Sequence, residues 1–367
     1  MAGRAPREAD DRRFMAAAIR LSRRHRGLTG TNPSVATLIV ADGRIVGRGV
    51  TALGGRPHAE TQALEEAGPR ARGATAYVTL EPCAHHGRTP PCAEALVAAG
   101  VRRVVGAASD PDPRVSGGGY AILRAAGIEV RENVLAEAAA DMLRGYLTRA
   151  VRRRPEVILK LALSADGKIG IAGRGQVPIT GPVARRQVHM MRAEVDAILV
   201  GIGTALADDP ALTCRLPGLE ARSPARIVLD RRLRLPTDGK LARSAHEVPL
   251  LLAAEGAAAP QRRAALAACG AEFLAVEAPG GRIALPELME DLAARGVSSL
   301  MVEGGALTAQ SFLAEGLVDR LSLFVGPGEI GPQGIASPVG PGNIPAGFGK
   351  RREDRFGEDV HFEYVRA

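Results

Sequence analysis

The chain carries the sequences HAE at residues 58–60 and PCAHHGRTPPC at residues 82–92. His58, Cys83 and Cys92 offer one imidazole and two thiolates, which can fill three positions around a zinc ion and leave the fourth open to water. Glu60 stands two residues after the histidine, close enough to move a proton at such a site. A zinc ion with an open position performs chemistry, whereas one with four protein ligands only stabilises a fold. The motif therefore predicts a catalytic zinc site.

Two other interpretations of these residues stay open at this point. The histidine and the cysteines can meet by coincidence in a globular core, or His85 or His86 can complete a closed structural zinc site. The first interpretation does not explain why the helix and strand patterns that flank each ligand also fit a catalytic zinc site. The second gives Glu60 no role. Both are therefore weaker than the catalytic interpretation.

The zinc deaminases of nucleobases and nucleosides have the same layout, with a zinc-binding His, a Glu two residues later that is not a ligand, and a later Pro-Cys with a second Cys. In this chain eight residues separate Cys83 from Cys92, where most of that superfamily has two. This spacing, with HHGRTPP at residues 85–91, resembles the deaminase half of the bifunctional riboflavin-biosynthesis deaminase/reductase family. The resemblance implies that Asn32 holds the pyrimidine and that Arg88 and Asp110 contact the ribose phosphate.

Composition indicates a soluble globular protein of two domains, since the chain has 367 residues with 46% hydrophobic and 24% charged side chains. No apolar run approaches the length of a membrane span, and residues 1–13 are charged without an apolar segment. We therefore expect neither a signal peptide nor a membrane anchor, and a cytoplasmic location. Four cysteines are too few for a disulfide framework in a chain of this length, which fits a reducing compartment.

The net charge of +8 suits either nucleic acid or phosphorylated small molecules as partners. Aromatic residues make up only 3% of the chain and tryptophan is absent, so few side chains are available for stacking on the bases of a single strand. We therefore expect a phosphorylated small-molecule substrate, with no nucleic-acid or membrane partner.

Helix and strand patterns alternate through the first 150 residues, which is typical of parallel strands joined by crossover helices. His58 and Glu60 would open one helix and Cys92 another, where the positive end of the helix favours carboxylate and thiolate. The expected elements are a helix over 11–24, hairpin strands 35–40 and 44–50, helix 58–67, strand 74–80, helix 91–99, strand 101–107, helix 120–126 and strand 128–131.

A helix over 136–154, ending in a basic run, leads to a second alternation, so we expect domains at 1–150 and 151–367. Residues 252–281 are rich in Ala and Gly and are expected to form loops and a short helix. The further expected elements are strand 156–163, helix 182–194, strands 197–200, 226–229 and 249–253, helix 285–294, strand 299–302, helix 307–314 and strand 320–325.

The second domain has no strand followed by Gly-x-Gly-x-x-Gly, so the usual dinucleotide fingerprint is absent. Gly201-Ile202-Gly203 follows a strand but runs on into residues 204–210, which we expect to form a loop. Residues 200–213, with 159–161, 164–167 and 302–305, resemble the reductase half of the same riboflavin family in order and context. The resemblance covers residues 11–330 and implies a fold class of α/β, with a cytidine-deaminase-like domain followed by a dihydrofolate-reductase-like domain that uses NADPH.

The resemblance also implies roles for residues of the second domain. We further expect Lys160, Asp208 and Glu303 to converge around one cleft and to take part in catalysis. The positions implied to contact the sugar-phosphate substrate are Lys160, Gln176, Arg192, Leu212, Arg215 and Glu303. The positions implied to contact the cofactor are Ala162, Thr204, Asp208, Gly305, Ala306, Leu307, Thr308, Ala309, Gln310 and Ser311. Residues 305–311 join a strand to a helix, whose backbone N–H groups suit a phosphate.

The sequence departs from the family pattern at Thr31, Thr51 and Pro178, which affects the fine substrate contacts and the packing around nicotinamide but not the zinc chemistry. We expect a bifunctional enzyme with Zn²⁺ and NADPH, assembled as a homo-oligomer through the reductase domain. Two alternatives stay open, namely a deaminase whose second domain is inactive, and a protein that binds or edits RNA.

Overall fold

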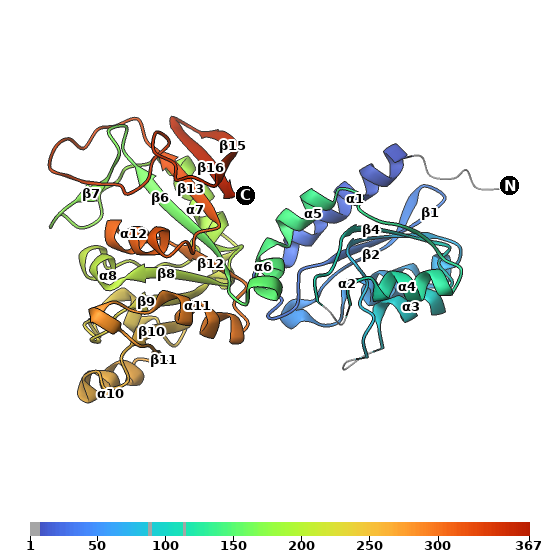
Figure 1. Cartoon of the computed structure of the whole chain (residues 1–367), viewed down its shortest axis with the longest axis horizontal. Coiled ribbons are helices and arrows are strands. Elements are labelled where there is room, and N and C mark those ends of the chain that lie inside the picture. Colours follow the sequence, from blue (N-terminus) through green and yellow to red (C-terminus); the bar gives the residue numbers. More distant parts are fainter. Residues whose placement is uncertain (1–7, 87–89, 113–114) are drawn as a thin grey trace. The chain divides into compact units, whose positions relative to one another are not determined.

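A computed structural model describes residues 8–86, 90–112 and 115–367 of the chain. The chain divides into two compact units, Met1–Arg153 and Arg154–Ala367, and each surrounds its own hydrophobic core (Figure 1). Both units alternate helices and strands, which confirms the expected α/β class. Within the described ranges, no helix is both long enough and apolar enough to cross a membrane.

The N-terminal unit is built on a five-stranded sheet with the order β2-β1-β3-β4-β5. β1 runs antiparallel to both β2 and β3. The turn at Asp42 and Gly43, both with positive φ, folds β2 straight back on β1. Only β3, β4 and β5 are parallel, as expected for strands joined by helices. The elements are α1 (Glu8–Ser22), β1 (Ala36–Ala41), β2 (Arg44–Val50), α2 (Ala59–Ala67), β3 (Thr75–Leu80), α3 (Cys92–Ala98), β4 (Arg103–Ala108), α4 (Gly118–Ala125), β5 (Glu129–Arg131), α5 (Ala136–Met142) and α6 (Arg144–Arg152).

The single helix expected over 136–154 is wrong, because α5 and α6 are separated at Leu143. Leu143 takes φ −97° and ψ 5°, which interrupts the helix, and its side chain is buried in the core. Periodicity could not show this break, since both halves have helical sequences. Burial of Leu143 accompanies the interruption.

The C-terminal unit contains a nine-stranded sheet with the order β11-β10-β9-β8-β12-β6-β13-β16-β15. In this order, the strands from β11 to β13 run parallel to their neighbours. β16 runs antiparallel to β13, and β15 runs antiparallel to β16. The elements are β6 (Glu156–Leu163), β7 (Lys168–Ile171), α7 (Pro182–Arg192), β8 (Ala197–Gly201), α8 (Ile202–Asp208), β9 (Ala225–Leu229), α9 (Lys240–Arg243), β10 (Leu250–Ala254), α10 (Pro260–Ala268), β11 (Glu272–Ala275), α11 (Leu285–Ala294), β12 (Ser299–Val302), α12 (Ala306–Ala314), β13 (Arg320–Val325), β14 (Gly334–Ala336), β15 (Phe348–Phe356) and β16 (Asp359–Arg366).

Two expectations for the C-terminal unit need correction. Residues 204–210 were expected to form a loop, but α8 covers most of them. Ala205 packs into the core, and Asp209 ends the helix with φ 37° directly before Pro210. The region 252–281 contains strand β11 as well as the short helix α10.

The hairpin of β15 and β16 had no counterpart among the expected elements. β15 has the charged sequence FGKRREDRF and lies mostly exposed at the edge of the sheet, where, among the described strands, it pairs only with β16. Charged residues are typical of edge strands, where they discourage pairing with other chains. A hydrophobic pattern therefore could not reveal this strand.

Candidate active sites

The N-terminal unit brings His58, Cys83 and Cys92 together. Their ligand atoms all lie within 4.8 Å of one another. The Nδ1 atom of His58 is 3.3 Å from Sγ of Cys92 and 3.8 Å from Sγ of Cys83. Ordinary Zn–N and Zn–S bonds at tetrahedral angles separate nitrogen from sulfur by about 3.6 Å. The distances from His58 to the two sulfurs are therefore close to those around a single zinc ion bound by all three residues.

Local structure explains why these ligands meet. His58 is the N-cap residue of α2, and Cys92 is the first residue of α3. Cys83 follows the fully buried strand β3, and the backbone N–H of Cys92 donates a hydrogen bond of 3.2 Å to its sulfur. Hydrogen bonding from Cys92, and then from His58, lowers the pKa of Cys83 to about 4. A thiolate, the form that binds metal, is therefore favoured at Cys83.

Glu60 lies in the first turn of α2 and is only 4% exposed. Burial raises the pKa of this carboxyl group, and the negative charge of Cys83 raises it further. A carboxyl group whose pKa moves toward neutrality is suited to take up and release a proton. Among the described residues, the metal-binding group includes neither His85 nor His86, and His86 instead lies 3.4 Å from Glu94. This arrangement disfavours the closed structural site.

The positions implied to bind the pyrimidine substrate have well-defined surroundings. Asn32 forms a tight turn with Thr29, whose hydroxyl donates a hydrogen bond of 2.7 Å to the Asn32 carbonyl. Asp110 is buried and accepts hydrogen bonds from the Tyr146 hydroxyl at 3.0 and 3.2 Å. Burial raises the pKa of Asp110. Arg88 lies outside the described residues.

Glu81 is a buried carboxylate beside this site that the sequence analysis did not single out. It stands two residues before Cys83 and accepts hydrogen bonds from the backbone N–H groups of Gly117 and Gly119, at 3.1 and 3.2 Å. A side chain at Gly119 would collide with the carbonyl of Pro82, since its Cβ would lie 1.9 Å from that oxygen. The sequence feature that could have indicated Glu81 is its position, since it is an acidic residue between a buried strand and the pair Pro82-Cys83.

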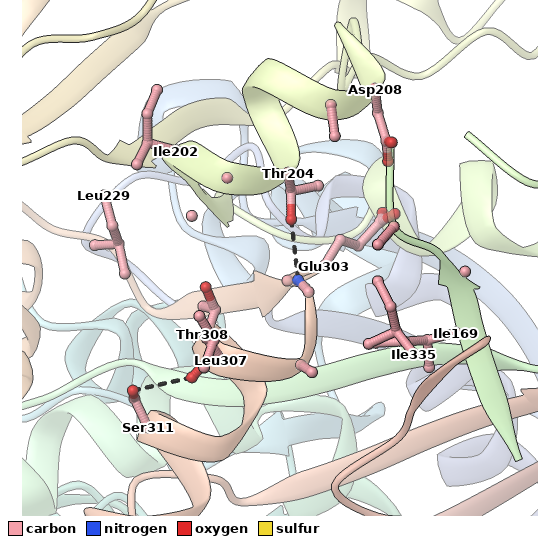
Figure 2. Close-up of a pocket in the computed structure, with 18 of the residues that line it drawn as sticks. Ile169, Ile202, Thr204, Asp208, Leu229, Glu303, Leu307, Thr308, Ser311 and Ile335 are labelled. Atoms are coloured by element: carbon pink, nitrogen blue, oxygen red, sulfur yellow. Dashed lines mark hydrogen bonds between the residues drawn. The ribbon is translucent and has the colours of Figure 1, made fainter. Parts of the chain in front are cut away.

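The C-terminal unit holds a cavity of about 980 Å³ at the carboxyl ends of its parallel strands (Figure 2). Such edges are the usual ligand sites of open α/β sheets. Asp208, Glu303 and Thr308 face this space from three different segments. Of the positions implied by the sequence, those that line the cavity are Lys160, Ala162, Gln176, Thr204, Asp208, Glu303, Gly305, Ala306, Leu307, Thr308 and Ser311.

Five implied positions are not part of the cavity lining. Ala309 packs in the core beneath α12, whereas Gln310 is exposed. Leu212 is buried in the core, with a positive φ of 55°. Arg192 lies behind Glu303 and contacts it directly, and Arg215 follows the same loop as Leu212.

Lys160, Arg192 and Glu303 form a buried charged cluster at one end of the cavity. Arg192 donates two hydrogen bonds to the Glu303 carboxylate at 2.8 and 2.9 Å, and the Lys160 ammonium lies 3.8 Å from it. Burial pushes the pKa of Glu303 upward, but Arg192 and Lys160 together lower it to about 2. Burial lowers the pKa of Lys160, although Glu303 opposes that shift. The cluster therefore keeps Glu303 ionised beside an ammonium group that releases its proton more readily than usual.

The loop between β12 and α12 is held close to β8. The hydroxyl of Thr204 accepts a hydrogen bond of 3.0 Å from the backbone N–H of Gly305 (Figure 2). At Gly201 an added Cβ would lie 2.5 Å from the hydroxyl of Thr308, so the close approach of these segments requires a glycine. The first turn of α12 leaves N–H groups without helical partners, and these face the cavity beside Thr308. Asp208 lies across the cavity, and burial raises its pKa.

The opposite end of the cavity is lined by arginines that the sequence analysis did not single out. Arg231, Arg232 and Arg234 follow β9, and Arg282 belongs to the segment before α11. The sequence feature that could have indicated the arginines after β9 is the basic run DRRLR at residues 230–234, directly after a strand.

Comparison with known proteins gives matches to both units. A family model for the cytidine and deoxycytidylate deaminase zinc-binding region matches residues 8–108, and one for the RibD C-terminal domain matches residues 155–362. The chain is 37% identical over 352 residues to the riboflavin biosynthesis protein RibD of Aquifex aeolicus, covering 95% of this chain and 97% of the relative. It is 40% identical over 333 residues to RibD of Escherichia coli K12, covering 88% of this chain and 89% of the relative.

Solved structures resemble the chain over almost its entire length. A structure of Acinetobacter baumannii RibD matches with a TM-score of 0.86 at 35% identity, covering 98% of this chain and 100% of that one. A diaminohydroxyphosphoribosylaminopyrimidine deaminase/5-amino-6-(5-phosphoribosylamino)uracil reductase of Thermotoga maritima matches with a TM-score of 0.85 at 32% identity, covering 98% and 99%.

Proposed function

The chain belongs to the RibD family of riboflavin-biosynthesis proteins, and on that premise we propose which of its residues carry the two reactions. The chain is a bifunctional enzyme, a zinc-dependent deaminase and an NADPH-dependent reductase. It deaminates 2,5-diamino-6-(ribosylamino)pyrimidin-4(3H)-one 5'-phosphate and then reduces the ribosyl group, giving 5-amino-6-(ribitylamino)uracil 5'-phosphate. The observation that carries the residue assignment is that each unit gathers one set of reactive side chains, a metal-binding triad in one and a charged cluster beside a large cavity in the other.

His58, Cys83 and Cys92 would hold the zinc ion of the deaminase. When bound, zinc supplies a reactive water at neutral pH by lowering that water's pKa. Glu60 takes up a proton from the attacking water at its carboxylate and delivers it to the departing amino group. The water oxygen becomes bonded to the pyrimidine carbon, the C–N bond breaks, and ammonia leaves. Its burial supports this role, because burial raises the pKa of the Glu60 carboxyl group above its ordinary value and so favours uptake of a proton. Asn32 would hold the pyrimidine, with Asp110 and Arg88 as contacts to the ribose phosphate.

Lys160 would act as the proton donor of the reductase. When bound, NADPH supplies the hydride that reduces the sugar carbon. The ring C–O bond breaks in this step, and the ring oxygen must gain a proton, which the Lys160 ammonium or a water that it orients can provide. Its lowered pKa supports this role. Asp208 and Glu303 would orient the reacting groups rather than form a covalent bond.

Arg215 is the better candidate for the phosphate of the second substrate. The guanidinium of Arg192 is already engaged by Glu303 and by the Thr213 carbonyl, which lies 3.1 Å away. Within the described part of the chain, the Arg215 side chain has no such partner. Arg192 would therefore act through Glu303, while Arg215 contacts the phosphate directly.

We also propose a cytoplasmic location and a homo-oligomer formed through the C-terminal unit.

The test uses purified full-length protein, the diaminopyrimidine substrate, and ammonia and NADPH consumption followed separately. We expect ammonia release without NADPH, and NADPH oxidation only once deaminated product is present. Ammonia release without NADPH oxidation, even with product supplied directly, would favour the alternative of a deaminase with an inactive second unit. A thermal shift with RNA and none with NADPH would favour the RNA-binding alternative.

A further inference from the structure

Two side chains of helix α6 contact the segments of the N-terminal unit that are assigned above to the deaminase substrate. The hydroxyl of Tyr146 donates a hydrogen bond to the carboxylate of Asp110. The guanidinium of Arg149 donates one to the backbone carbonyl of Thr31, the residue before Asn32. Tyr146 and Arg149 stand three residues apart, so they lie on the same face of the helix. One helix face therefore reaches both the position assigned to the ribose phosphate and the position assigned to the pyrimidine.

The Asp110 carboxylate is held in one orientation. The Tyr146 hydroxyl lies 3.0 Å from Oδ1 and 3.2 Å from Oδ2, and the backbone N–H of Asp112 donates to Oδ1 at 3.0 Å. Asp110 is only 6% exposed, so rotation of the carboxylate would leave a buried oxygen without its donor. A carboxylate can accept about four hydrogen bonds, so these contacts leave it able to accept from a ligand as well. Because a carboxylate repels a phosphate, this capacity suits the hydroxyl groups of the ribose.

The surroundings of Tyr146 keep its hydroxyl protonated and fixed in position. Burial and the negative charge of Asp110 raise the pKa of the phenol above its ordinary value of 10. The group is therefore a hydrogen-bond donor at neutral pH. Its ring packs against the hydrophobic core of the N-terminal unit beside Leu147. Since a tyrosine side chain has only two rotatable angles, packing of the ring also places the hydroxyl, and with it the Asp110 carboxylate.

The turn at Asn32 is confined from several sides. The Thr29 hydroxyl donates to the Asn32 carbonyl at 2.7 Å. The Asn32 amide group lies so close to Gly55 that a Cβ added to this glycine would be 2.4 Å from Nδ2. Arg149 holds the carbonyl of the peptide bond between Thr31 and Asn32. These contacts fix the backbone on both sides of Asn32, and they thereby set the direction of its side chain.

We propose that Tyr146 and Arg149 are positioning residues of the deaminase, with Tyr146 orienting the Asp110 carboxylate toward the ribose and Arg149 fixing the Asn32 turn beside the pyrimidine. This inference rests on the proposed deaminase function and adds helix α6 to the elements that serve it. Both residues act on substrate contacts rather than on the zinc ligands or Glu60. Their loss should therefore weaken substrate binding and leave the zinc content and the chemical step unchanged.

The first experiment measures KM and kcat for ammonia release by the full-length protein without NADPH, together with the zinc content. Tyr146→Phe removes only the hydroxyl and should raise KM about 10- to 100-fold, the scale of a hydrogen bond to a charged group, with kcat within about threefold of wild type. The control Tyr77→Phe removes a hydroxyl that donates to another buried carboxylate, that of Asp11, at 2.9 Å. The control should lower Tm but keep the wild-type KM. An unchanged KM in Tyr146→Phe, or an equal rise in the control, would overturn the proposal.

The second experiment tests whether each residue acts through its assigned contact. In the background of Asp110→Ala, Tyr146→Phe should change KM no further, because the hydrogen bond is already lost. Arg149→Met should raise KM about 3- to 10-fold in wild type and by the same factor in Asp110→Ala, since it acts on the Asn32 turn. Arg152→Met, at an exposed position of the same helix, is the control and should keep the wild-type KM.

Full additivity of Tyr146→Phe and Asp110→Ala would overturn the proposal, because Tyr146 would then act on stability rather than through Asp110. An unchanged KM in Arg149→Met would overturn it for the Asn32 turn. Either result in an enzyme that releases ammonia contradicts this inference alone. Absence of ammonia release from the wild-type protein would overturn the proposed deaminase function, and this inference with it.

Discussion

Arg192 and Glu303 form a two-point ion pair, with Nε to Oε1 at 2.8 Å and Nη2 to Oε2 at 2.9 Å, although 111 residues separate them in sequence. Their side chains are only 11% and 12% exposed. A planar guanidinium can hold a carboxylate at both oxygens, which an ammonium cannot. The pair therefore fixes the orientation of Glu303 at the edge of the reductase cavity.

Arg192→Lys should lower kcat/KM of the reductase by about 10- to 100-fold, because the charge remains but the two-point contact is lost. Ammonia release by the other unit should be unaffected. Steady-state kinetics with deaminated substrate provide the measurement, and Arg186→Lys, at an exposed position of the same helix, is the control. Wild-type reductase kinetics in Arg192→Lys would show that the geometry of the pair has no role.

The stability of the C-terminal unit should fall as pH is lowered from about 4.5 toward 2. Despite its burial, Glu303 has a pKa of about 2 in the folded protein because of Arg192 and Lys160, against an ordinary value of 4.5. A carboxyl group whose pKa is lower in the folded state stabilises that state fully above the unfolded pKa, and this stability is lost as pH falls through the folded pKa. Thermal melts across this range should show a weaker pH dependence in Glu303→Gln. Equal pH dependence in both proteins would contradict the assignment.

Glu60→Gln should retain zinc yet abolish deamination, with a loss of roughly 10²- to 10⁴-fold, because an amide cannot move the proton. Metal analysis and ammonia release give the two readouts. Loss of zinc from this variant would identify Glu60 as a ligand and refute the proton-transfer role.

Cys83→Ser should lose zinc and deaminase activity together, while reduction of pre-deaminated substrate largely survives. The two units have separate hydrophobic cores, so damage to one site need not unfold the other. Cys214→Ser, at a buried cysteine of the C-terminal unit, is the control and should keep its zinc. If chelation stopped both reactions equally without unfolding the protein, the assignment of separate sites would be wrong.

Lys160→Ala should depress NADPH oxidation by roughly two orders of magnitude or more, the usual scale for a positioned acid, while ammonia release continues at the wild-type rate. Lys160→Met keeps most of the side-chain volume and should be equally impaired if the proton, rather than packing, matters. Unchanged NADPH oxidation in both variants would remove Lys160 from the mechanism.

Local patterns in the sequence were sufficient to predict the α/β class and most of the helices and strands. They were also sufficient to select His58, Cys83 and Cys92 as one group, because each ligand stands at the start of a helix or the end of a buried strand. Positions fixed by such short-range geometry can be read from spacing alone. The resemblance to a known family then indicated the cavity-lining residues 305–308 of the second unit.

Only the tertiary structure revealed that Arg192 is held by Glu303, and that Arg232, Arg234 and Arg282 meet at one end of the cavity. These contacts join segments far apart in the chain, and an arginine in a sequence looks the same whether it is paired, free or exposed. The hairpin of β15 and β16 escaped prediction for a related reason, since its charged outer strand exists through pairing with β16 rather than through a hydrophobic pattern. The sequence determined the elements and the zinc-binding group because local geometry controls them, whereas the partner of each buried charge depended on how the sheet brings distant strands together.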